Sequence, residues 1–273
     1  MKVDLCMWAK NGARFLPVVL KRIDKVIPNE NVNQKIFVDD SSIDDSIQIA
    51  KDFNWSVYTN KEGFVAGGVK EALSHVKSEL FIGIEQDVIL NLNWFDKIPS
   101  YMSDPKVAIA SGARVPTHPV LREIKSYWYA NTKDVKGTMD NTIFRTKVIR
   151  QIGIPDVSVA PISVDRYLHS SICELGYKWI VDKKVVSDHI RFGLIEEERH
   201  FDKLSKLGRL KTPFHEISMF KMFRLVGTSP IRGLHIAFKS KRPLTLPYYV
   251  YQRLTGARRL VRRKRQNNVE SIT

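Results

Sequence analysis

Short apolar runs alternate with helix-like stretches through the first 110 residues, and this alternation limits the folds open to the chain more than any other feature. Four apolar runs predict strands, at residues 2–9, 35–40, 55–60 and 80–87. Apolar residues at helical spacing follow each of the first three runs, at residues 13–27, 44–53 and 67–77. Such a repeat is typical of a mostly parallel sheet with helices on both faces. The sequence therefore predicts a Rossmann-like α/β fold.

The pattern is less regular after Val107. It predicts a strand at 107–116, a strand running into a helix at 142–153, a helix at 164–178 and a strand at 179–189. From about residue 200 the sequence is basic and aromatic, and prolines at positions 213, 230, 243 and 247 predict that it is divided into short pieces. We expect one domain at residues 1–200, with halves of about 1–110 and 111–200, and a basic, mainly helical C-terminal appendage at residues 201–273.

A local signal concerns the start of the helix after the second apolar run. Ser42 is followed three residues later by Asp45. A serine followed at this spacing by an acidic residue is a variant of the capping box. The sequence therefore predicts that a helix begins at Ser42.

Four carboxylates fall at two of the expected strand ends. Asp39 and Asp40 end one strand, and Glu85 and Asp87 end another. Because ligands of open α/β sheets bind at the carboxyl ends of the strands, we expect these side chains to converge on one crevice. Two carboxylates two residues apart repel each other, and a divalent cation such as Mg²⁺ or Mn²⁺ would relieve that repulsion and could hold the phosphates of a nucleotide. The alternative is that Glu85 and Asp87 only begin a solvent-exposed loop.

Five segments with these features occur in a particular order. They read LCMWAKNGARFLPVVLKRI, IFVDDSSIDDS, NKEGFVAGGVKEAL, LFIGIEQDVIL and PISVDRYLHSSICELGYK. In this order and spacing they resemble the family 2 glycosyltransferases with the GT-A fold, over about residues 1–190. The resemblance implies an inverting enzyme of glycan biosynthesis that transfers a sugar, such as a hexose, from a nucleotide-sugar donor with the help of Mn²⁺ or Mg²⁺.

The resemblance also implies roles for particular residues. Asp165 matches the base that takes the proton of the acceptor hydroxyl, and Asp87 and His189 match metal ligands. Glu85 replaces the first aspartate of Asp-x-Asp, as a metal ligand or a ribose contact. The nucleotide would be bound by Trp8, Ala9, Lys10, Asp39, Asp40 and Glu85.

The sequence departs from the family pattern at two places. Gly68-Val69-Lys70 stands where the family often has Ala-Arg-Asn, so an arginine that could contact the donor phosphates is missing. The base motif often reads Glu-Asp, whereas Asp165 is the single acid here. Two other functions stay open. One is a nucleotidyltransferase that shares the nucleotide site and the metal but attacks at phosphorus. The other is a non-catalytic polyanion-binding protein with a vestigial nucleotide site, which the departures at Glu85 and Val69 allow.

Purely structural interpretations also exist for these residues. Asp39 and Asp40 could be turn acids beside the next helix, and Asp165 could be an acid favoured at a helix N-terminus. His189 could be a structural histidine.

The positive charge is concentrated at the C-terminal end. Residues 201–273 contain 17 Lys and Arg but only 3 Asp and Glu, so they carry +14 of the net charge of +15. This asymmetry predicts a polyanionic partner for the appendage. Basic clusters beside apolar and aromatic residues suit an anionic membrane surface, and they would also suit single-stranded nucleic acid. We favour the membrane, because a glycosyltransferase can act on a lipid-linked acceptor as well as on a glycan.

Three features of the sequence predict the cellular compartment. The N-terminus lacks the apolar region of a signal peptide, and the longest run without a charge, Pro243–Gln252, is too short to span a bilayer. Cys6 and Cys173 are the only cysteines, which favours a reducing compartment. We therefore expect a cytoplasmic protein held peripherally on the cytosolic face of the membrane.

Overall fold

The computed structural model describes residues 1–207 and 219–270, and the chain divides into two compact units. The first unit combines Met1–Val115 with Asp134–Ile190, and the second combines Pro116–Lys133 with Arg191–Thr273. The second unit thus includes a segment from the middle of the chain. The domain boundary expected at residue 200 stays a prediction.

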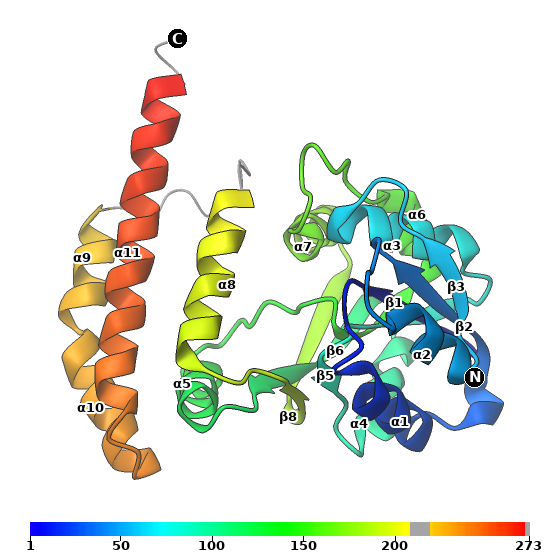
Figure 1. Ribbon diagram of the computed structural model, residues 1–273, viewed down its shortest axis with the longest axis horizontal. Helices are drawn as coiled ribbons and strands as arrows, with labels where there is room; N and C mark the ends of the chain where they lie inside the picture. Colours follow the sequence, from blue (N-terminus) through cyan, green and yellow to red (C-terminus); the bar gives the residue numbers. More distant parts are fainter. Residues whose placement is uncertain (208–218, 271–273) are drawn as a thin grey trace. The chain divides into compact units, whose positions relative to one another are not determined.

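The first unit is built on an eight-stranded sheet with the strand order β3-β2-β1-β4-β7-β6-β8-β5 (Figure 1). Strands β1 to β4 pair in parallel, whereas β7 is antiparallel to β4 and β6, and β5 is antiparallel to β8. The strands are β1 (Val3–Ala9), β2 (Val32–Asp39), β3 (Ser56–Thr59), β4 (Leu80–Ile84), β5 (Val88–Ile89), β6 (Val107–Pro116), β7 (Asn141–Arg145) and β8 (Lys178–His189). The predicted α/β class is confirmed.

Helices cover both faces of this sheet because alternate residues of its strands belong to different cores. In β1, Leu5 and Met7 join the core cluster that includes α1, whereas Cys6 and Trp8 join the cluster that includes α3 and α7. Burial on both faces explains why β1 reads as a nearly continuous apolar run. The helical segments of this unit are α1 (Leu16–Val26), η1 (Asn29–Asn31), α2 (Ser46–Asp52), α3 (Phe64–His75), α4 (Trp94–Lys97), η2 (Pro99–Ser103), α6 (Thr146–Ile152) and α7 (Val164–Glu174).

One buried carboxylate ties three parts of the sheet together. Asp4 of β1 is fully buried and accepts hydrogen bonds from the side-chain amides of Asn33 (2.8 Å) and Gln34 (2.9 Å) and from the N–H groups of Lys77 and Ser78. Burial alone would raise the pKa of Asp4, but these hydrogen bonds outweigh it and hold the pKa below its usual value. Asp4 is therefore an ionised structural anchor.

The predicted helix start at Ser42 is wrong. Helix α2 begins at Ser46, and the Ser42 hydroxyl instead accepts a hydrogen bond from the N–H of Asn11 at 2.8 Å. Asp44 accepts one from the N–H of Ser46 at 3.1 Å. Ser42 and Asp44 thus join the loops that follow β1 and β2, because Ser42 accepts from Asn11 and Asp44 also accepts the N–H of Ala13 at 3.0 Å.

The second unit is helical in the residues described. It consists of α5 (Pro119–Ala130), α8 (Leu194–Leu207), α9 (Met219–Gly227), α10 (Ser229–Ser240) and α11 (Thr245–Glu270). The predicted division into short pieces is wrong for α11, which has 26 residues. Pro230 and Pro247 lie in the first turns of α10 and α11, where a missing N–H costs no helix hydrogen bond, and Pro213 lies outside the described residues. Every helix that the structure describes is too short or too polar to cross a bilayer.

Candidate functional site

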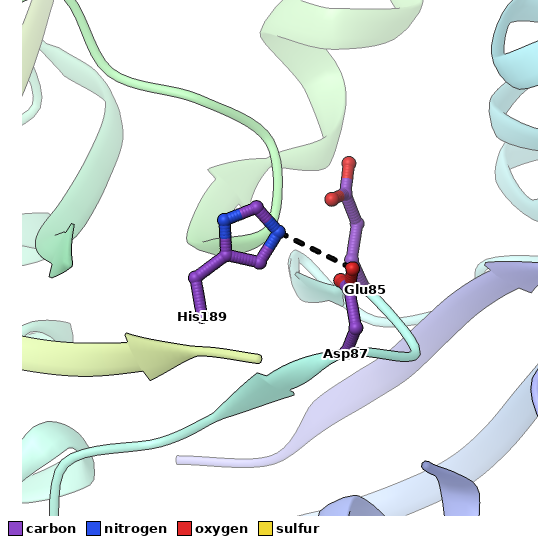
Figure 2. A group of neighbouring side chains, drawn as sticks. All are labelled: Glu85, Asp87 and His189. Carbon is purple, nitrogen blue, oxygen red and sulfur yellow. Dashed lines mark ion pairs between the residues drawn. The ribbon is translucent and has the colours of Figure 1, made fainter. Parts of the chain in front are cut away.

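Glu85, Asp87 and His189 come together at one edge of the sheet (Figure 2). Glu85 and Asp87 lie in the turn between β4 and β5, and His189 ends β8. The antiparallel pairing of β5 with β8 sets Val88 opposite His189, and the N–H of Ile190 donates to the carbonyl of Asp87 at 2.9 Å. One potential ligand atom from each side chain lies within 4.8 Å of the others. We call these three residues the triad.

The donor atoms of the triad fit a divalent cation. The Nε2 atom of His189 lies 3.3 Å from Oδ2 of Asp87, and both side chains are largely shielded from solvent. Carboxylate oxygens suit Mg²⁺ and Mn²⁺, and histidine is the commonest metal-ligating side chain. Among the side chains that the structure describes, the triad is the only group of three or more His, Cys, Asp or Glu residues placed this closely with potential ligand atoms.

An arginine that sequence analysis missed lies beside the triad. Arg114 of β6 places Nη1 3.6 Å from Oε2 of Glu85 and 3.4 Å from Nε2 of His189. It also forms an ion pair with Asp140, which is fully buried directly before β7. The only signal in the sequence is a lone charge within the small and apolar residues of VAIASGARVP.

The loop after β1 contacts the turn that carries the triad acids. Lys10 places Nζ 3.4 Å from Oδ2 of Asp40, so these two predicted nucleotide-binding residues form an ion pair. The side chain of Gln86, between the two triad acids, bonds the backbone of Lys10. A Cβ atom on Gly12 would lie 2.6 Å from Oε1 of Gln86, so a larger residue at position 12 would have to displace the Gln86 amide from Lys10. Gln86 was not identified from the sequence.

The remaining predicted nucleotide-binding residues are buried. Trp8, Ala9 and Asp39 are 7%, 6% and 5% exposed. Asp39 accepts the N–H of Ser42 at 3.0 Å through Oδ2, whereas its buried Oδ1 has no hydrogen-bond partner in the described part of the protein. Asp39 therefore offers one unused acceptor at the end of β2.

The side chain of Trp8 lies close to two glycines. A Cβ atom on Gly68 or on Gly83 would lie 2.8 Å from the Trp8 side chain. Gly68 lies in α3, so the absence of a side chain there lets α3 pack against Trp8.

Asp165 lies in the first turn of α7 and is partly buried. Its Oδ1 accepts a hydrogen bond from the N–H of Arg166 at 2.8 Å. Burial raises the pKa of Asp165 above its ordinary value, and the charge of Asp140 adds to this, against the opposing effects of Arg166 and Arg114. The charges of Arg114 and Asp140, beside the triad, thus influence the pKa of the predicted base Asp165.

Comparison with known protein families decides the class of the chain. Residues 4–156 match the family described as Glycosyl transferase family 2. The chain belongs to this family. A comparison of this chain with curated proteins found no match.

Solved structures with a similar fold include three glycosyltransferase systems. The mannosyltransferase PcManGT from Pyrobaculum calidifontis, in complex with GDP-Man and Mn²⁺, has a TM-score of 0.60 at 15% identity, over 93% of this chain and 87% of that one. Glucosyl-3-phosphoglycerate synthase from Mycobacterium tuberculosis has a TM-score of 0.57 at 13% identity, over 76% and 78% of the two chains. S. aureus TarS 1–349 in complex with UDP has a TM-score of 0.52 at 12% identity, over 94% and 92%.

These comparisons confirm the predicted family and its GT-A fold. The identities are low, so the similar structures establish the fold of this family 2 glycosyltransferase and leave the roles of its site residues as predictions.

Proposed function

We propose that the protein transfers a hexose from a nucleotide-sugar donor to a hydroxyl or phosphate of a lipid-linked or glycan acceptor, with inversion at the sugar. The observation that carries this proposal is the convergence of Glu85, Asp87 and His189 from two distant segments in a family 2 glycosyltransferase. PcManGT is known in complex with GDP-Man and Mn²⁺, and the mycobacterial synthase in complex with UDP and Mn²⁺.

Asp87 and His189 are the proposed ligands of Mn²⁺ or Mg²⁺, and Glu85 either completes the ligand set or contacts the ribose. When bound, such an ion neutralises the negative charge that develops on the leaving diphosphate. The short turn between β4 and β5 and the pairing of β5 with β8 keep the three side chains together before a donor arrives.

Residues at the ends of β1 and β2 are proposed to bind the nucleotide. Asp40, held by Lys10, offers a carboxylate for the base and the ribose, and the buried Oδ1 of Asp39 offers an acceptor for a nucleotide N–H or hydroxyl. Because Trp8 and Ala9 are buried, we assign them a supporting role at the floor of the site.

Asp165 is the proposed base that takes the proton of the acceptor hydroxyl. A general base works best when its pKa lies near the operating pH, and burial moves the pKa of Asp165 in that direction. Its position in the first turn of α7 fixes the backbone while the carboxylate stays partly accessible.

A donor panel tests this function. UDP, GDP and dTDP sugars are added with and without Mn²⁺, and thermal stability and released products are measured. A bound donor should stabilise the fold by about 2.7 kcal/mol at a hundredfold excess over its dissociation constant. Release of a nucleoside diphosphate supports glycosyl transfer. Release of pyrophosphate would instead indicate a nucleotidyltransferase, and no metal-dependent binding would indicate a vestigial site.

We also propose that the second unit holds the enzyme on an anionic membrane surface. Along α10, Ile231, Leu234 and Phe238 lie at helical spacing and are 74%, 60% and 88% exposed. The opposite side of α10 is buried: Gly233 meets Leu246 of α11 within 3.0 Å of where a Cβ atom would be. Helix α10 therefore exposes an apolar stripe to solvent, whereas a helix that only packs on a core exposes its polar residues.

Exposed aromatic and basic residues also occur on α9 and at the end of α10. On α9, Phe220 and Phe223 are 78% and 65% exposed. Lys239, Lys241 and Arg242 are exposed at the end of α10. Apolar groups next to cations match the interface of an anionic bilayer, where burial and charge attraction both contribute.

A further inference from the structure

Arg114 lies where the triad and a buried carboxylate meet. Its Nη1 atom is 3.6 Å from Glu85 and 3.4 Å from Nε2 of His189, and it forms an ion pair with Asp140. A protein cation thus already contacts two of the three proposed metal ligands.

The surroundings of Asp140 explain why this cation is held in place. Asp140 is fully buried, and its Oδ1 accepts a hydrogen bond from the hydroxyl of Thr138 at 2.7 Å. Its backbone carbonyl accepts the N–H of Glu85 at 3.2 Å, which fixes Asp140 next to the turn that carries the triad acids. A buried carboxylate needs a paired cation, so Arg114 is drawn toward the triad and is only 23% exposed in its side chain.

A guanidinium in this position competes with a divalent cation for the same atoms. Nη1 of Arg114 lies 3.4 Å from Nε2 of His189, and because Arg114 only donates, a hydrogen bond between them requires the tautomer in which Nε2 carries the lone pair that would bind a metal ion. Its charge also repels an ion bound at Glu85. The same guanidinium suits a diphosphate, because its planar fork of N–H donors matches phosphate oxygens.

We propose that Arg114 is a built-in counter-cation of the metal site: it holds Glu85 and His189 in the ion-free protein and passes to the donor diphosphate when a divalent cation takes these ligands. This inference rests on the proposed function of the triad. It makes Arg114 a positioning residue in the free protein and a phosphate-binding residue in the donor complex.

The proposal has a thermodynamic consequence. Free Mn²⁺ should bind weakly, because it must displace Arg114, whereas the diphosphate gives Arg114 a new partner and so favours Mn²⁺ binding. Because such coupling is reciprocal, Mn²⁺ should strengthen nucleotide binding by the same factor. Removal of Arg114 should reduce this coupling.

The experiment measures Mn²⁺ binding by electron paramagnetic resonance of the free ion, without nucleotide and with saturating UDP or GDP. Arg114→Met should bind Mn²⁺ alone at least about tenfold more tightly than the natural protein, since one positive charge next to the ligands is lost. The enhancement of Mn²⁺ affinity by the nucleotide should fall at least about tenfold in this variant. Arg114→Lys keeps the charge and should stay close to the natural protein.

Two further variants separate this role from a change in net charge or stability. Arg22→Met also removes one positive charge, but Arg22 donates to the carbonyl of Leu90 at 2.9 Å, so Mn²⁺ affinity should not change. If Arg114→Met alone does not fold, Arg114→Met with Asp140→Asn removes the buried carboxylate as well and leaves the net charge unaltered. That double variant should still bind free Mn²⁺ more tightly than the natural protein.

Variants of Arg114 that fold and bind free Mn²⁺ no more tightly than the natural protein would overturn the proposal. Asp87→Ala in the Arg114→Met background should abolish the tight binding. If it did not, the proposed metal site and this inference would both be wrong. If Asp87 contributes to Mn²⁺ binding but Arg114→Met does not tighten it, only the role of Arg114 is wrong.

Discussion

The side-chain amide of Gln86 bonds both backbone groups of Lys10: the N–H of Lys10 donates to Oε1 at 2.9 Å, and Nε2 donates to the Lys10 carbonyl at 3.1 Å. Gln86 sits between Glu85 and Asp87, and Lys10 pairs with Asp40. One amide thus links the proposed nucleotide site at the end of β1 to the turn that carries the two acids of the triad.

Gln86→Met should separate these two parts of the site. The substitution keeps the length of the side chain but removes both hydrogen bonds, which should lower stability by about 1–2 kcal/mol. Binding of Mn²⁺ and UDP or GDP together should weaken by about tenfold, because the turn is no longer held to Lys10. Calorimetric titration measures this. Gln48→Met, which removes an exposed bond to Asp52, is the control; equal binding in both variants would exclude a role for the link.

Asp87→Ala should abolish metal-dependent donor binding and leave the fold intact. The change removes a proposed ligand and also relieves the repulsion between Glu85 and Asp87 in the ion-free protein, so the midpoint of thermal unfolding should not fall. A thermal-shift titration with Mn²⁺ and donor checks both points. Asp96→Ala, at an exposed acid of α4, should respond to Mn²⁺ and donor like the natural protein. Normal Mn²⁺ and donor binding by Asp87→Ala would remove Asp87 from the metal site.

Asp165→Asn should retain donor binding and lose transfer, because the amide keeps the shape of the carboxylate but cannot accept a proton. Burial raises the pKa of Asp165, and a base acts only when ionised. Activity of the natural protein should therefore rise as the pH increases through this raised pKa. As the pH is lowered, activity should be lost at a higher pH than it would be with a base that has the pKa of an ordinary aspartate. The pH profile of turnover at saturating donor tests this, and unchanged turnover by Asp165→Asn would contradict the assignment.

The parts of the fold that sequence analysis predicted are those with strong local patterns. β1 and β4 are buried on both faces and so read as apolar runs, and β6 was predicted with its observed bounds. Helix α5 was not predicted, although Val120, Leu121 and Ile124 lie at helical spacing in its sequence and pack together in the second unit. The two-residue strand β5 exists through its pairing with β8, which a local pattern does not contain.

The same distinction applies to the candidate site. Glu85 and Asp87 lie in one motif, and His189 was placed by resemblance to the family. Arg114 and Asp140 lie on different segments and meet because β6 and β7 pair with Ser111 opposite Thr142, a register that one sequence does not specify. The pairing of Lys10 with Gln86 likewise depends on the β1–β4 contact.

Asp4→Asn tests the anchor beneath the site. The amide cannot accept the same hydrogen bonds from Asn33, Gln34, Lys77 and Ser78, so stability at pH 7 should fall by about 3 kcal/mol. The folded-state pKa of Asp4 is lowered, so its contribution is present above the unfolded pKa of about 3.9 and is lost as the pH falls through the lower folded-state pKa. The free energies of unfolding of the natural protein and of Asp4→Asn, measured with urea, should therefore become equal in strong acid. A difference that does not depend on pH would show that the charge of Asp4 is not responsible.

The last prediction concerns the apolar stripe of α10. If Ile231, Leu234 and Phe238 enter an anionic bilayer, replacing all three by serine should weaken sedimentation with phosphatidylserine-containing liposomes by at least about tenfold, since each loses apolar burial. Replacing Lys239, Lys241 and Arg242 by glutamine should weaken binding mainly at low salt, because salt screens only the charge attraction. Ile43→Ser is the matched control, since Ile43 is 93% exposed on the first unit.

The salt dependence separates the membrane from other partners of the same surface. High salt should release the natural protein from liposomes only in part, because the apolar contribution remains. Binding to a single-stranded oligonucleotide would instead weaken steeply with salt, with a slope of roughly 0.7 per phosphate neutralised. A second copy of the chain on the stripe would appear as a dimer in sedimentation velocity that the triple serine variant lacks. A natural protein that stays in the supernatant with anionic liposomes at low salt would end the membrane proposal, because both contributions are then at full strength.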